Sequence, residues 1–216
     1  MNIWILHPKQ HQLTFGRHPS IFRRTLAPDC NMSKYCYSPL PSEHDTIHLL
    51  HLMPNEDETA PIQCQLFKYP LQRLDNRIHL YEALSYVWGD PCNTLPIFVE
   101  EHSFPVMVNL HAALSRLRDQ FLQRIIWVDA ICINQNNEKE KSQQIQLMAG
   151  IYSKASRVIV WLGEETPDSE RALEEIRLAA ELGGTKPQIN GSMKQPILEL
   201  LQREWFKRIW VRTRHY

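Results

Sequence analysis

Residues 81–90 read YEALSYVWGD, and residues 127–135 read WVDAICINQ. Each stretch begins with the apolar and aromatic residues of a buried strand and ends in polar and small residues that a strand does not need. A third apolar run, RVIVWL at 157–162, is closed by Gly163 and Glu164. Strands without clean polar alternation are covered on both faces, so these three segments predict the centre of a sheet.

Helical periodicity fills the gaps between these strands. Helices are expected over about 110–121, from about 137, and over about 169–182, and Asn109 is placed to cap the first of them. The core-facing residues expected in the first two helices are Leu110, Leu114, Leu117, Phe121, Ile145, Met148 and Ile151. The order strand, helix, strand, helix, strand, helix favours an α/β fold with parallel neighbours and strand 81–88 at their centre.

The chain divides into three parts by composition and hydrophobic periodicity. Residues 1–45 carry five of the fourteen prolines and no sustained periodicity, so we expect a loosely ordered N-terminal extension. The α/β domain is expected over 46–211, with a β-hairpin over about 96–108 as an insertion between the first central strand and its helix. Residues 212–216 form a divergent tail.

The composition excludes several classes of partner. Hydrophobic residues make up 43% of the chain, and the 24 basic and 24 acidic side chains cancel to a formal charge of +0. A nucleic-acid surface or a polybasic membrane patch needs clustered positive charge, which the sequence lacks. No segment approaches the roughly 18 apolar residues of a membrane-spanning helix. We therefore expect no nucleic-acid partner and no membrane.

The cysteines and histidines favour an intracellular protein without a metal. The five cysteines form no CxxC pair and no secretory leader precedes them, which predicts free thiols in a reducing compartment. The ten histidines are scattered, so we expect no metal site. The sequence also lacks GxGxxG, GKS/T and HExxH, which argues against phosphate-loop and zinc-protease chemistry.

The carboxyl ends of the first two central strands carry the candidate site, because ligands of open α/β sheets bind outside that edge. The candidate ligand-binding residues are Ser85, Tyr86, Trp88, Gly89, Asp129 and Asn134. They offer a hydroxyl, an aromatic stacking face, a glycine that permits close backbone approach, and a carboxylate that accepts several hydrogen bonds. The structural alternative is open: Trp88 fills the core before a turn, and Asp129 organises the strand-to-helix loop.

Three further residues lie in the same stretches. Glu82 and Asp90 belong to the first strand-end cluster, and Asp90 follows Gly89 in a Gly-Asp-Pro turn. Cys132 would act as a nucleophile only with a base in reach, and no histidine is near it in sequence. Its apolar neighbours raise the pKa of a thiol, so we expect no catalytic role for it.

Four motifs, in order and spacing, resemble the fungal heterokaryon-incompatibility (HET) domain over about residues 47–211. They are YEALSYVWGD, VNLHAALSRLR, WVDAICINQNNEKEKSQQIQLMAGIYSKASRVIVWLGE and REWFKRIWV. The resemblance implies a cytoplasmic module of fungal non-self recognition that triggers growth arrest or programmed cell death, with protein partners and homotypic self-association. The family usually continues with Gln-Glu after the last motif. Here residues 212–216 read RTRHY, so we expect a domain that is incomplete at its C-terminus.

The HET domain is in turn distantly similar to Toll/interleukin-1-receptor (TIR) domains, some of which cleave NAD. That similarity implies a flavodoxin-like, mainly parallel sheet with flanking helices, no bound cofactor, and NAD as a candidate substrate. TIR enzymes place a catalytic glutamate six residues beyond a serine, which from Ser169 is Glu175. The alternative for Glu175 is a solvated helix face with ion pairs to nearby arginines. A degenerate, non-toxic interaction domain is a third hypothesis.

Overall fold

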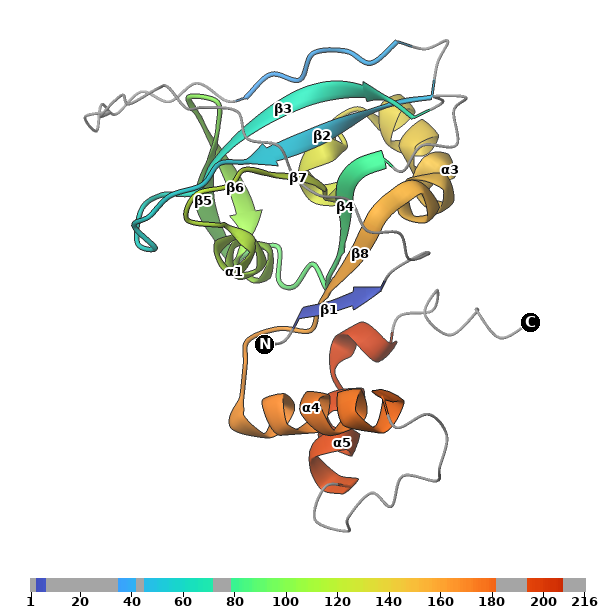
Figure 1. Cartoon of the computed structure of the whole chain (residues 1–216). Helices are drawn as coiled ribbons and strands as arrows, with labels where there is room; N and C mark the ends of the chain where they lie inside the picture. Colours follow the sequence, from blue (N-terminus) through green and yellow to red (C-terminus); the bar gives the residue numbers. More distant parts are fainter. Residues whose placement is uncertain (1–2, 7–34, 42–44, 72–78, 182–193, 208–216) are drawn as a thin grey trace.

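The computed structural model describes residues 3–6, 35–41, 45–71, 79–181 and 194–207 (Figure 1). Most of the predicted extension 1–45 and the whole of the predicted tail 212–216 lie outside these ranges. The proposed domain boundaries therefore stay predictions.

A sheet of eight strands forms the centre of the fold, in the order β1-β8-β4-β7-β2-β3-β5-β6. The strands are β1 (Ile3–Leu6), β2 (Thr46–Leu52), β3 (Gln63–Pro70), β4 (His79–Ser85), β5 (Thr94–Val99), β6 (His102–Met107), β7 (Arg124–Trp127) and β8 (Ala155–Trp161). Strand β4 pairs in parallel with β7 on one side and with β8 on the other. The predicted trio of parallel strands, with the 81–88 segment at its centre, is confirmed.

The prediction of a mainly parallel sheet is wrong, because the sheet is mixed. Strand β2 is antiparallel to both β3 and β7, β5 is antiparallel to β6, and β1 is antiparallel to β8. Among the other described strands, β3 and β5 pair in parallel. Short connections explain the antiparallel pairing of β2 with β3 and of β5 with β6, since consecutive strands joined without a crossover pair antiparallel. Strands β1 and β2 join β8 and β7 from distant positions in the sequence, which no local pattern encodes. The hairpin β5–β6 is the predicted insertion, whereas edge strand β1 was not predicted.

Helices cover both faces of the parallel trio. They are α1 (Val108–Leu117), α2 (Asp129–Cys132), α3 (Glu138–Lys154), α4 (Pro167–Glu181) and α5 (Lys194–Leu201), followed by the 3-10 helix η2 (Glu204–Lys207). Neighbouring residues of a strand point to opposite faces. Tyr81 donates its hydroxyl hydrogen bond to the Ile151 carbonyl of α3, whereas Glu82 binds Arg124, which reaches the Leu117 carbonyl of α1. Helices α1 and α3 therefore lie on opposite sides of β4 (Figure 1).

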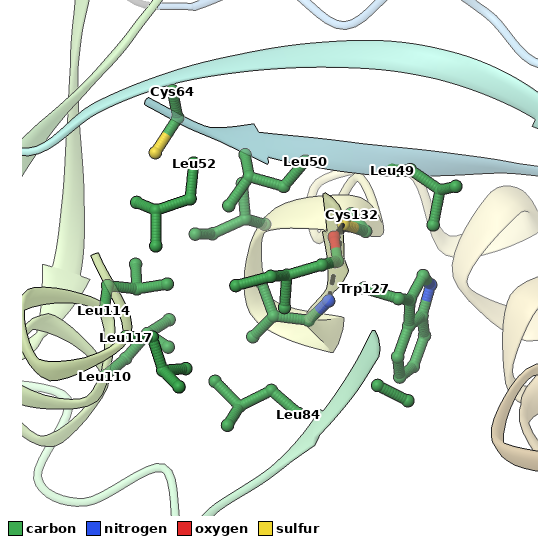
Figure 2. Close-up of a cluster of buried hydrophobic side chains, with 14 of the residues drawn as sticks. Leu49, Leu50, Leu52, Cys64, Leu84, Leu110, Leu114, Leu117, Trp127 and Cys132 are labelled. Atoms are coloured by element: carbon green, nitrogen blue, oxygen red, sulfur yellow. Dashed lines mark hydrogen bonds between the residues drawn. The ribbon is translucent and has the colours of Figure 1, made fainter. Parts of the chain in front are cut away.

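The main core contains side chains of the sheet, of α1 and of α3. Figure 2 shows Leu110, Leu114 and Leu117 of α1 gathered around the same core as Leu52 and Leu84. The helix stripe was predicted correctly as far as Leu117. A smaller second core of four buried residues joins the end of β8 to α4 and α5: Val160, Leu162, Ala172 and Leu200.

Two predicted core residues are wrong. Phe121 is exposed because α1 ends at Leu117, where Arg118 takes up an extended conformation and binds backbone carbonyls of the β2–β3 loop. Ile145 of α3 is 53% exposed. Gln144 takes the inward position instead, because its side-chain amide donates to the Thr46 carbonyl at the start of β2.

Candidate functional site

Two of the predicted ligand-binding residues meet at the carboxyl ends of β4 and β7. The indole Nε1 of Trp88 donates a hydrogen bond of 3.0 Å to Oδ2 of Asp129. The other carboxylate oxygen accepts from the backbone N–H of Ala130 at 2.8 Å. The parallel pairing of β4 and β7 brings these residues together across 41 positions of sequence, as expected for neighbouring strands of an α/β sheet.

A cavity of about 340 Å³ opens beside this pair. Its lining residues are Trp88, Asp129, Ile133, Gln135, Lys141, Ile145 and Met148. The walls combine an aromatic ring and aliphatic side chains with the ammonium group of Lys141 at the rim, which has a long ion-pair contact of 3.9 Å to Glu138. Such a lining suits a flat, mainly apolar group. Exposed Ile145, which was expected in the core, contributes one wall.

Ser85 and Tyr86 lie behind this cavity and do not line it. Both are buried. The hydroxyl of Ser85 accepts a hydrogen bond of 3.0 Å from Trp205 Nε1, which comes from η2. A second cavity of about 340 Å³ lies on the η2 side and is lined by Val87, Trp88, Glu204 and Lys207. Trp88 therefore lines both cavities, while Ser85 fastens η2 to the end of the central strand.

Asn109 joins the end of the central strand β4 to the end of β8 and was missed as a site residue. The prediction that it caps α1 is wrong: the N-cap residue is Met107, and Asn109 lies inside the first turn. Its amide donates to the Val87 carbonyl, and its oxygen accepts from Trp161 Nε1 at 2.8 Å. Sequence alone could not distinguish these long-range hydrogen bonds from a helix cap, because an asparagine at the start of a helix is compatible with both.

Gly89 shapes the turn after Trp88. Its φ of 85° lies in a region that side chains with a Cβ rarely adopt, so the turn requires glycine. Asp90 then accepts from the backbone N–H of Cys92 at 2.9 Å and closes the turn. These contacts support the structural alternative for the Gly-Asp-Pro segment.

Asn134 and Cys132 serve the loop between β7 and α3. The backbone N–H of Asn134 donates to Glu140 Oε1 at 3.1 Å, and Asn137 caps α3 by accepting from the Glu140 N–H, as predicted. Cys132 is fully buried, and burial raises the pKa of its thiol. Its thiolate is therefore strongly disfavoured, in agreement with the expectation of no catalytic role.

Glu175 lies on the exposed face of α4 and lines neither cavity. Its neighbour Glu174 pairs with Arg177 at 3.4 Å, one turn along the same solvated face. A carboxylate in open solvent interacts only weakly with a developing charge. Among the described residues, Glu175 therefore lies at neither of the two cavities.

A buried ion-pair cluster lies at the other end of the trio. Glu82 is buried, and its carboxylate binds Arg124 at 2.7 Å and Arg157, each from a neighbouring strand. Sequence reasoning assigned Glu82 to the strand-end cluster and did not name its partners. The available signal was a lone acidic residue in an apolar strand, with an arginine near the start of each neighbouring strand.

Two classes of site are not seen in the described parts of the chain. No group of three or more His, Cys, Asp or Glu side chains there comes together to hold a metal ion. No helix within the same ranges is both long and apolar enough to cross a bilayer.

Comparison with known proteins gives a family and one relative. The family model "Heterokaryon incompatibility protein (HET)" matches residues 81–212, which include both strand ends and the cavity beside Trp88. The chain is 36% identical over 156 residues to heterokaryon incompatibility protein 6, OR allele, of Neurospora crassa. That match covers 66% of this chain and 22% of the relative. No solved structure matches the chain.

Proposed function

This chain belongs to the heterokaryon incompatibility (HET) family, and from that premise we propose that it is a cytoplasmic HET-domain module of fungal non-self recognition. In this proposal, its self-association triggers growth arrest or programmed cell death. The observation that carries the proposal is the family match over residues 81–212, which spans the parallel trio and its carboxyl-end site. The relative in Neurospora crassa is named for heterokaryon incompatibility, although the shared region is only 22% of its length.

The geometry of the carboxyl-end site supports a binding module. Polar groups there are engaged with one another: Trp88 with Asp129, and Ser85 with Trp205. The cavity beside Trp88 is lined mainly by aromatic and aliphatic carbon, with Lys141 at its rim. Preformed surfaces of this kind recognise a ligand or a partner side chain without providing a free acid, base or nucleophile.

Inducible expression in a fungus tests the proposal. Expression of residues 1–216 is expected to arrest growth. Trp88→Ala removes the wall that both cavities share and should abolish the arrest, whereas Glu175→Ala on the exposed face of α4 is the matched control and should not. Normal growth with the wild-type chain would contradict the proposal and favour a degenerate, non-toxic interaction domain.

Cleavage of NAD is the alternative function, and one observation favours keeping it. Asp129 places a carboxylate beside the ring of Trp88 in a cavity whose rim carries Lys141. Glycosidic cleavage uses a carboxylate to stabilise an oxocarbenium-like state, and does so best away from water. Loss of NAD with purified, concentrated protein is the test. Turnover abolished by Asp129→Ala and kept by Glu175→Ala would support this function, and no turnover by the wild-type chain would exclude it.

A further inference from the structure

The amino ends of the parallel strands carry a fixed, exposed apolar turn. The three most exposed large hydrophobic side chains of the described residues are Leu80, Phe121 and Leu122, with exposed fractions of 79%, 70% and 68%. Phe121 and Leu122 follow α1, and Asp119 Oδ1 accepts from both of their backbone N–H groups, at 2.8 and 2.9 Å. Because the turn is already ordered, covering it with a partner costs little conformational entropy.

An excess positive charge lies on one side of this turn. The Glu82 carboxylate binds Arg124 through two guanidinium nitrogens and binds Arg157 through Nε. Two guanidinium groups and one carboxylate leave a net charge of +1 (2 − 1 = +1). The side chain of Arg157 is 36% exposed, and no described residue binds its terminal nitrogens. A guanidinium held through Nε presents its outer fork in a fixed direction, which suits a carboxylate.

An acidic loop lies on the other side of the turn. Glu56, Asp57 and Glu58 are exposed residues of the connection between β2 and β3. Arg118 fixes this loop by donating to the carbonyls of Asp57 and Glu58, at 3.2 and 2.7 Å. The N–H of Asn55 donates to the Asp119 carbonyl at 3.1 Å, so the acidic loop adjoins the apolar turn.

Sheet order sets these three features in a line. The strands run β8-β4-β7-β2-β3, and Leu52 at the end of β2 pairs with Arg124 at the start of β7. The spatial order across this edge of the sheet is therefore Arg157, then Leu80 and the apolar turn of Phe121 and Leu122, and then the acidic loop. At about 4.8 Å between neighbouring strands, β8 and β2 lie roughly 14 Å apart. We call these residues the amino-end surface.

We propose that the amino-end surface is a homodimer interface, in which the acidic loop of each copy binds Arg157 of the other. A two-fold axis through the apolar turn brings Phe121 and Leu122 of the two copies together. The same axis exchanges the positive and negative ends, so every charge meets its opposite. The proposal rests on the self-association put forward as part of the function and assigns it a surface and a partner, a second copy of this chain.

Sedimentation velocity of the 216-residue chain tests the apolar part of the interface. The wild-type chain should dimerise, and Phe121→Asp should weaken the dimer by about tenfold or more, because it places a carboxylate in the apolar centre. Leu198→Asp is the matched control, since Leu198 of α5 is an exposed aliphatic side chain that belongs neither to this surface nor to the two cavities, and it should leave dimerisation unchanged. A wild-type chain that stays monomeric at high concentration would overturn the inference.

A charge exchange tests the pairing itself. Glu56→Lys/Glu58→Lys and Arg157→Glu should each weaken the homodimer, since like charges then meet on both sides. An equal mixture of the two variants should restore dimers, because each reversed end meets its complement. If Arg157→Glu fails to fold beside Glu82, then Arg157→Gln added to the loop variant should relieve the repulsion and strengthen its dimer.

The outcomes separate this inference from the proposed function. Dimers that form but ignore the charge variants and Phe121→Asp would overturn the amino-end surface and leave self-association intact. Dimers that respond as expected, in a chain that does not arrest growth, would support the surface and contradict the proposed function.

Discussion

The two ends of strands β8, β4 and β7 hold their polar residues in different ways. At the carboxyl ends, side chains bind one another or the backbone: Trp88 binds Asp129, Trp205 binds Ser85, and Asn109 joins Val87 to Trp161. At the amino ends, Glu82 is buried between two arginines, and Arg157 keeps part of its guanidinium in solvent. Polar side chains at the carboxyl ends thus bind other groups of the protein, whereas the amino ends expose part of a charged group to solvent.

The comparison shows that the position of a polar residue in the fold and its availability for binding are separate properties. The carboxyl-end rule for α/β sheets selected this edge, and a cavity does open there beside Trp88 and Asp129. Several residues at that edge nevertheless form their hydrogen bonds with other groups of the protein. The energies also differ, because a neutral hydrogen bond contributes about 1 kcal/mol and a broken buried ion pair costs several times more. Substitutions at the two ends should show this contrast.

The largest effect is expected from Glu82→Ala at the amino ends. Removing the carboxylate leaves Arg124 and Arg157 facing each other in a partly buried setting, so the free energy of unfolding should fall by about 3 kcal/mol. Urea denaturation measures it. Glu174→Ala, which removes an exposed ion pair with Arg177, is the control and should cost less than about 1 kcal/mol. Equal losses for both variants would show that Glu82 is not a buried electrostatic centre.

A smaller loss is expected from Asn109→Ala at the carboxyl ends. The variant leaves the Val87 carbonyl without its donor and Trp161 Nε1 without its acceptor, at about 1 kcal/mol each, or about 2 kcal/mol in total. Asn136→Ala, at an exposed position before α3, should change the free energy of unfolding by less than about 0.5 kcal/mol. An Asn109→Ala variant as stable as the Asn136→Ala control would contradict the role of Asn109 as a fastener.

These two residues also show where sequence reasoning succeeded and where it stopped. The parallel trio could be predicted because burial on both faces leaves a continuous apolar run that is visible locally. The partners of Asn109 and Glu82 lie 22 to 75 positions away, and no local pattern encodes them. The antiparallel hairpin β5–β6 was predicted, whereas the pairings of β2 with β7 and of β1 with β8 were missed for the same reason, since they join strands far apart in the sequence. Phe121 shows the local limit: its helical spacing continued past the point where Arg118 ends the helix.

Asp129→Asn tests how tightly the carboxyl ends are fastened. The carboxylate accepts from Trp88 with one oxygen and from Ala130 with the other, whereas an amide has a single acceptor oxygen. One of the two bonds must therefore be lost, at about 1.5 kcal/mol since the acceptor was charged. Urea denaturation gives the loss, and Asp168→Asn in the first turn of α4 is the control. A variant at Asp129 with no loss would show that Trp88 does not depend on the carboxylate.

The smallest expected effect is a pH dependence of the free energy of unfolding, which arises at the carboxyl ends. A histidine lies beside a glutamate there, whereas arginines bind the glutamate at the amino ends. His48 of β2 is buried, its Nε2 contacts the Ser38 carbonyl at 3.2 Å, and Glu140 lies 3.9 Å from its Nδ1. Burial lowers the pKa of His48, and this effect exceeds the opposing attraction of Glu140.

The direction of that pH dependence follows from proton binding. Because the pKa of His48 is lower in the folded protein, the unfolded chain binds more protons between the ordinary value of 6.5 and the folded value. Stability from His48 is therefore present above pH 6.5 and falls as the pH drops below that value. His51 and His111, whose pKa values are also lowered by burial, add to the same trend. Urea denaturation across this range should therefore give a flatter profile for His48→Gln than for the wild type. A steeper profile for the variant would mean that the attraction of Glu140 outweighs burial, and that this end also holds a charged pair.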